Sequence, residues 1–257
     1  MELVKSEPLI IDGVAHYTLT SYDPVSVEVD VPPVTDADID QAMQMSVAQL
    51  GGTPASLNDD AWIRENFEGV NNALELHEAL REQMLFMNEQ YAEEQKTVKC
   101  SIELARRLMQ RVPTKRVSEV RRMLDAMFQA SLNSDGITMD QFFAQSGMRR
   151  EEFENMLDTR AQGEAETEAA LDAWVEHFGM KVEDEELPGL LGIDPEQTEQ
   201  FMKQMHATGE IEDARVAALR SKALAQVVNE CECTYHHESQ DGQGGNGNGA
   251  GPRLKLV

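Results

Sequence analysis

One long stretch of helical periodicity limits what this chain can fold into. Apolar side chains recur at steps of three and four from Ala73 to Tyr91, and again from Val98 to Val112. That spacing places them on one face of an α-helix. An uninterrupted helix over residues 71–111 would be roughly 60 Å long. A single globular core does not need a helix of that length, so the pattern predicts an elongated helical body or a projecting arm.

Helical signals fill most of the remaining sequence. Hydroxyl or carboxylate caps, prolines in first turns and glycines after the last turn mark the ends of several more segments. They predict helices that begin near Thr35, Asn58, Pro113, Thr138, Phe153, Asp184, Asp194 and Ile211.

The β-type sequence lies mainly before residue 35. Asp12-Gly13 separates the β-rich runs Pro8–Ile11 and Val14–Thr20, which predicts a hairpin. Residues 25–31 alternate apolar and polar, as in a half-buried strand. The predicted fold class is mainly α, with elongated helical arms and a small β-rich N-terminal appendage.

Four consecutive segments follow from these patterns. We expect a β-rich appendage and linker over 1–34, a short helix and connection over 35–57, and a helical domain over 58–237. Residues 238–257 are rich in Gly and Asn, which is typical of a flexible tail. Within that tail, Arg253–Val257 is either a short linear motif or a remnant of cloning.

The charge of the chain excludes several partners. The formal net charge of −25 makes nucleic acids and anionic lipid surfaces poor ligands. No basic start leads into an apolar run, and no stretch has the length and apolarity of a membrane span. The 3 cysteines do not form a secreted disulfide framework. We therefore expect a cytoplasmic protein.

No motif for catalysis stands out. Phosphate-binding loops, zinc-protease helices and nucleophile elbows are missing from the sequence. His16, His77, His177 and His206 are isolated, so a non-enzymatic protein without a cofactor is expected. A weak zinc candidate is the cluster Cys231, Cys233, His236 and His237, whose Cys-x-Cys spacing is tighter than usual. The alternative for this cluster is a frayed helix end.

Methionine supplies the other candidate site. The chain holds 14 Met beside few aromatic residues, and flexible thioether side chains suit a surface that binds many apolar sequences. Ordinary core packing is the alternative for each one taken singly. The predicted polypeptide-binding residues are Met84, Met87, Met123, Met127, Phe128, Phe142, Met148, Met156, Trp174, Met202 and Met205.

The order of these helical motifs resembles the C-terminal substrate-binding domain of the trigger factor family. Asp59–Phe67 and Leu76–Arg81 look like the approach to the family's long linker helix, and Thr138–Phe143 with Gly147 looks like its first arm. The segment 25–43 is similar to the stretch that leads into the family's prolyl isomerase domain. The match covers about residues 58–230.

The sequence departs from the family in two places. Only about a dozen residues separate the end of the helix that begins near Thr35 from Trp62, so the isomerase domain has no room. The family's ribosome-docking signature, a Gly-Phe-Arg loop, is also missing, so ribosome binding is not expected.

The resemblance implies an ATP-independent chaperone, a holdase, that binds unfolded or nascent polypeptides. Three alternatives stay open. The chain could be a dedicated assembly scaffold for one folded partner. It could bind itself, as a homo-oligomer. A residual isomerase or metal-dependent activity ranks last.

Overall fold

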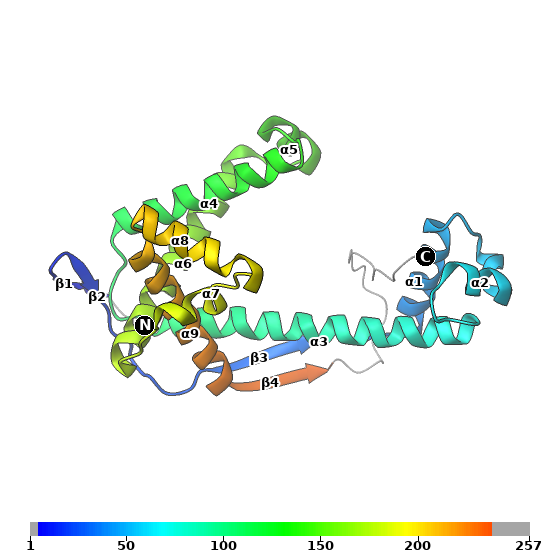
Figure 1. The fold of residues 1–257 in the computed structure, drawn as a ribbon, viewed down its shortest axis with the longest axis horizontal. Helices are drawn as coiled ribbons and strands as arrows, with labels where there is room; N and C mark the ends of the chain where they lie inside the picture. Colours follow the sequence, from blue (N-terminus) through cyan, green and yellow to red (C-terminus); the bar gives the residue numbers. More distant parts are fainter. Residues whose placement is uncertain (1–4, 238–257) are drawn as a thin grey trace. The chain divides into compact units, whose positions relative to one another are not determined.

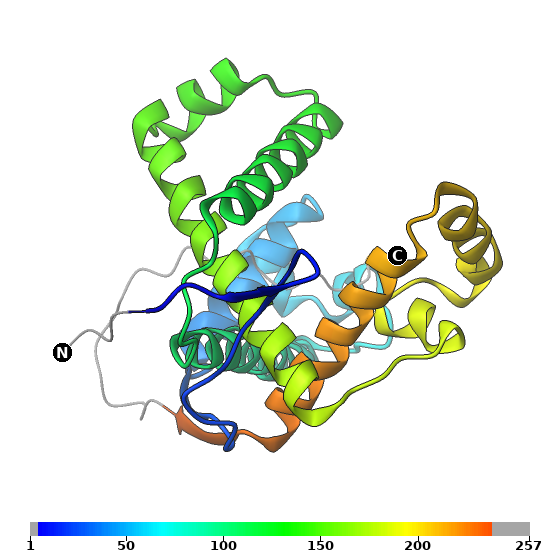
Figure 2. The same cartoon turned by 90° about the vertical axis from the view of Figure 1, so that its left-hand side faces the viewer.

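The computed structural model describes residues 5–237 and is mainly α-helical (Figures 1 and 2). The predicted tail over 238–257 lies outside the described residues. The described chain forms two compact units, one built from 5–27 with 97–232 and the other from 28–96 with 233–237. Each unit therefore combines segments that are distant in sequence, whereas the four segments expected from the sequence follow chain order.

The unit of residues 28–96 is a small helical cluster with a strand pair. Its core contains Ile39, Val47, Ile63, Leu76 and Leu80, which are buried together. Cap signals set the local structure: Thr35 and Asp38 form a capping box, and the Asp59 side chain accepts hydrogen bonds from the next helix. Its helices are α1 (Asp36–Gln49), α2 (Asp60–Asn66) and the first part of α3 (Ala73–Arg106), with a 3₁₀ turn at Pro54–Asn58.

The strand β3 (Ser26–Val31) alternates buried and exposed residues, as the sequence predicts. It pairs with β4 (Glu232–His237), a strand that the sequence did not predict. Val29, Val31 and Ala92 form a small core against which Cys233 packs. The frayed helix end expected for this segment is wrong, because the extended backbone of Cys231 ends the preceding helix and β3 offers a partner strand.

The unit of residues 97–232 is built around two long helices. α4 (Thr114–Ser134) packs along α6 (Arg150–Phe178), and α9 (Ile211–Glu230) packs on α6. Alanines at 161, 165 and 169 of α6 are buried, and their small size permits close helix approach. The connecting elements are α5 (Met139–Ser146), α7 (Leu187–Leu190) and α8 (Thr198–Thr208), with 3₁₀ turns at Asp184–Glu186 and Pro195–Gln197.

The long helix α3 is shorter than its periodicity predicts. It ends at Arg106, and the backbone of residues 107–111 instead bonds to the N-terminal segment. Met109 N donates to Thr18 O at 3.0 Å, and Arg111 N donates to Ser6 O at 2.7 Å. The helical placement of Met109 and Val112 is therefore wrong, because pairing with a distant segment outweighs the local apolar pattern.

The predicted N-terminal hairpin is confirmed. β1 (Leu9–Ile11) and β2 (Val14–His16) are antiparallel, with Ile11 opposite Val14. Asp12 and Gly13 both take positive φ, at 49° and 83°, as a two-residue type I′ turn requires. Among residues 5–237, no helix has both the length and the apolar character needed to cross a bilayer.

Candidate functional site

An open apolar surface lies on the long helices α4 and α6. Met123 and Met127 of α4 are 47% and 62% exposed, and Met156 of α6 is 46% exposed. The four-residue spacing of Met123 and Met127 places both on one face of α4. We call these three side chains the methionine surface.

Helix geometry places the three methionines on the same side of the α4–α6 contact. Leu124 and Leu157 are buried. Met123 and Met156 directly precede these two leucines, so each methionine lies about 100° around its helix from the buried side chain. On the opposite side of the α4–α6 contact, an ion pair joins the two helices: Arg121 of α4 lies 2.6 Å from Asp158 of α6. One edge of the contact is therefore sealed by charges, and the other presents thioethers to solvent.

Aromatic rings support the far end of this surface. Phe128 of α4 lies 4.9 Å from Phe153 and 5.1 Å from Phe142, measured between ring centroids. Phe143 contacts Phe153 as well, and the Arg150 guanidinium lies 4.9 Å above the Phe143 ring. These aromatic contacts, of which Phe128–Phe142 and Phe143–Phe153 are edge-to-face, fix α5 against the two long helices. In Figure 1, α5 lies at the end of α4 distant from Thr114.

The predicted binding residues are only partly brought together. Six of them lie on α4, α5, α6 or the short connection between the last two: Met123, Met127, Phe128, Phe142, Met148 and Met156. Met84 and Met87 belong to the unit of residues 28–96, where Met84 packs against the core. Met202 packs beside α7 and α9, and Met205 is half-buried.

Trp174 is a core residue. Its side chain is only 1% exposed, so it is not available to a ligand in this conformation. The ring lies 4.8 Å from Phe178 and 6.0 Å from Tyr22, whose own ring stacks on His177 at 3.7 Å. This aromatic group fixes the segment before β3 against the end of α6.

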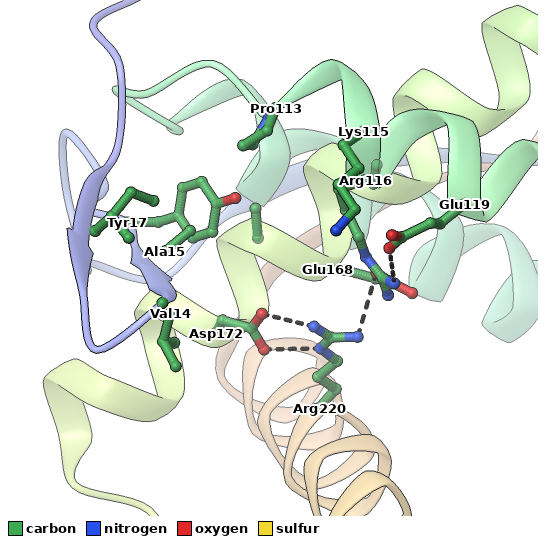
Figure 3. A pocket seen from close by; sticks show the side chains of 14 residues that line it. Val14, Ala15, Tyr17, Pro113, Lys115, Arg116, Glu119, Glu168, Asp172 and Arg220 are labelled. Carbon is green, nitrogen blue, oxygen red and sulfur yellow. Dashed lines mark hydrogen bonds and ion pairs between the residues drawn. The ribbon is translucent and has the colours of Figure 1, made fainter.

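A cavity of about 310 Å³ opens beside the N-terminal hairpin (Figure 3). Ile10, Val14 and Ala15 of the hairpin, together with Pro113, form the apolar lining of the cavity. The other wall is charged and comes from α4, α6 and α9, with equal numbers of cations and anions: Lys115, Arg116, Arg220, Glu119, Glu168 and Asp172.

The charges of this wall form a connected network. Arg220 binds Asp172 through two hydrogen bonds and also contacts Glu168 at 3.2 Å. Arg116 donates to the same Glu168 oxygen at 2.5 Å. Burial opposes the charge of Arg220 most strongly, but the hydrogen bonds and charges of Asp172 and Glu168 outweigh it and raise the Arg220 pKa.

Tyr17 borders the same network from the hairpin side. Burial raises the pKa of its phenol, and the negative charge of Asp172 raises it further. The tyrosine therefore stays neutral at physiological pH. Since both arginines already bind carboxylates, the cavity offers an amphipathic surface for binding and not a poised acid–base pair.

The sequence analysis missed this network and the apolar hairpin wall. Arg116 and Glu168 are 52 residues apart, and no local pattern pairs them. The only local sign is the spacing of Glu168 and Asp172, which places two carboxylates on one face of α6. The apolar hairpin wall could have been predicted from the run of large aliphatic residues in β1.

The weak zinc candidate does not form a metal site within residues 5–237. No group of three or more His, Cys, Asp or Glu side chains in this part of the chain is placed to hold a metal ion. On β4, Cys233 packs toward the Val29 core, whereas His236 reaches Glu28 at 3.5 Å. Cys233 and His236 are three positions apart on the strand, so these two side chains face opposite sides of it.

No protein-family model matches the chain, and a search of curated proteins finds no match.

Proposed function

We propose that this chain is an ATP-independent holdase of the trigger-factor type, which binds unfolded or partly folded polypeptides without a chemical step. The observation that carries the proposal is the methionine surface of α4 and α6, where three large apolar side chains are about half exposed. Thioether side chains adapt to many apolar sequences because they are unbranched and polarizable.

The physical properties of the chain support this mode of action. Each exposed methionine offers a small apolar area, so a client is held by several weak contacts and released by dissociation. The net charge of −25 repels other copies of the chain and keeps an apolar surface from causing self-aggregation. The resemblance of the helix order to the trigger factor family adds a second, independent reason. Isomerase activity and ribosome docking are not part of the proposal.

Suppression of aggregation tests the function. Purified protein in stoichiometric excess is expected to slow the aggregation of several unrelated denatured clients, followed by light scattering. The triple variant Met123→Gln, Met127→Gln and Met156→Gln keeps side-chain length and helix propensity but lowers apolarity, so it should lose most of this effect.

A matched control tests whether the effect depends on which methionines are replaced. Met45 and Met109 are also exposed but lie outside the methionine surface, so Met45→Gln with Met109→Gln should suppress aggregation as the unchanged protein does. Unfolding curves of both variants check that the fold is intact. The proposal is wrong if the unchanged protein has no effect, or if the triple variant retains full activity.

One observation favours a second candidate, a scaffold for one folded partner or for a second copy. The hairpin exposes Leu9, Ile10, Ile11 and Val14, and within residues 5–237 neither of its two strands pairs with a third strand. The edge of such a strand can accept a further strand from a partner. A single stoichiometric partner in pull-downs, or a concentration-dependent mass in light scattering, together with no general holdase activity, would favour this candidate.

A further inference from the structure

An uncovered face of α3 combines apolar and acidic side chains. Leu85 and Phe86 are 47% and 60% exposed, and Glu82 and Glu89 flank them. Positions 82, 85, 86 and 89 follow the spacing of one helix face. We call these four side chains the acidic face. They all belong to the unit of residues 28–96.

The acidic face points away from the core of its unit. Leu80 of α3 is buried among residues of α1 and α2. Leu85 and Phe86 follow Leu80 by five and six residues. Around the helix axis they therefore lie about 140° from Leu80 in one direction and about 120° from it in the other, so both point away from the core. No described residue of the unit buries them, so a solvent-facing aromatic ring remains between two glutamates.

The chain that follows β4 starts close to this face. The Tyr235 hydroxyl of β4 donates to the Glu93 carboxylate of α3. Glu93 is seven residues beyond Phe86, so the two are about 10 Å apart along the helix. The described chain ends at His237, two residues after this contact.

The sequence beyond β4 supplies a complementary segment. Arg253–Val257 reads Arg-Leu-Lys-Leu-Val, with two cations between aliphatic residues, whereas most of the chain is acidic. About 15 residues rich in Gly, Asn and Gln connect it to His237, and a chain of this composition spans roughly 20 Å on average. The segment therefore reaches the acidic face without strain.

We propose that Arg253–Val257 docks on the acidic face of α3 in the same molecule. Leu254 and Leu256 cover Phe86 and Leu85, while Arg253 and Lys255 neutralise Glu82 and Glu89. Both the apolar and the charged parts of the segment then meet a matching group. A short tether gives an effective concentration in the millimolar range, so weak contacts suffice.

Zero-length carbodiimide cross-linking of the full chain tests this docking. We expect an amide link between the Lys255 amine and Glu82 or Glu89, identified by mass spectrometry of the monomer fraction. The yield should fall at high salt, because the charges of this exposed site are screened. A mixture of isotope-labelled and unlabelled protein tells links within one molecule from links between copies. Absence of these links, or links between copies only, overturns the proposal.

Substitutions that leave the Lys255 amine and the Glu82 and Glu89 carboxylates in place measure how much the apolar contacts contribute to docking. Phe86→Ala should lower the yield of the link by about tenfold, since a covered aromatic ring is lost. Tyr91→Ala is the matched control: Tyr91 is 48% exposed on the same helix but lies about 140° around it from Phe86. Equal yields from the two variants contradict the docking described here.

Discussion

Arg220 of α9 binds Asp172 of α6 through two parallel hydrogen bonds, from Nε to Oδ1 at 2.7 Å and from Nη2 to Oδ2 at 2.6 Å. This fork geometry is the strongest form of an arginine–carboxylate pair. The two residues are 48 positions apart, so the pair joins helices that the chain itself does not hold together. Glu168 extends the connection to Arg116 of α4.

Breaking this pair should destabilise the unit of residues 97–232. The Arg220 side chain is only 20% exposed, so Arg220→Ala leaves the Asp172 carboxylate with uncompensated charge in a partly buried place, while Glu168 keeps Arg116. We expect a loss of about 1–3 kcal/mol in the free energy of unfolding. Urea unfolding followed by circular dichroism measures this loss.

An exposed ion pair on α8 provides the control. Lys203 contacts Glu199 four residues earlier, and both side chains are largely exposed. Lys203→Ala should therefore change the unfolding free energy by less than about 0.5 kcal/mol. Similar losses in the two variants would show that the Arg220 network adds no particular stability.

Two tyrosines should ionise late in the folded protein. Burial, followed by the charge of Asp172, raises the pKa of Tyr17. A hydrogen bond to Glu93, followed by burial, raises the pKa of Tyr235. Each phenol then keeps its proton longer in the folded chain than in the unfolded chain.

The sign of the resulting pH dependence follows from proton binding. Above the ordinary tyrosine pKa of about 10, the folded state binds more protons than the unfolded state, so stability falls as pH rises. The stabilisation is complete below that value and is lost as pH rises through the folded pKa. Phenolate absorbance should rise at higher pH in native protein than in urea, and Tyr17→Phe and Tyr235→Phe should each remove part of this difference. Superimposable titrations of folded and unfolded protein contradict the prediction.

Elements with local causes were predictable from the sequence. The hairpin follows from Asp12-Gly13, where a type I′ turn needs positive φ at both residues. The start of α1 follows from the capping box of Thr35 and Asp38, and the end of α6 follows from the left-handed Gly179.

Elements whose conformation depends on residues distant in sequence were not predictable from the sequence. β4 is extended because β3, about 200 residues earlier, pairs with it, as the bond from Glu232 N to Val25 O illustrates. The methionine surface is intermediate. The sequence indicated which methionines could bind, but exposure depends on packing, which buries Trp174 and leaves Met127 open.

Gly52 should tolerate no side chain. A Cβ at this position would lie 2.6 Å from Trp62 Cζ2 and 2.8 Å from Val47 Cγ1. Val47 is buried and cannot move freely, so Gly52→Ala forces a shift of the Trp62 ring or of the backbone. We expect a loss of about 1–3 kcal/mol in unfolding free energy, with a change in tryptophan fluorescence that reports the displaced ring.

Gly163 offers the opposite outcome with the same substitution. It lies inside α6, and a Cβ there would meet no atom within 4 Å. Alanine restricts the unfolded chain and favours helix, so Gly163→Ala should raise the unfolding free energy by roughly 0.5–1 kcal/mol. Urea unfolding of the two alanine variants under one set of conditions checks both predictions, because their effects have opposite sign. A loss of stability for Gly163→Ala would mean that the close packing of α4 on α6 depends on a helix that bends at this glycine.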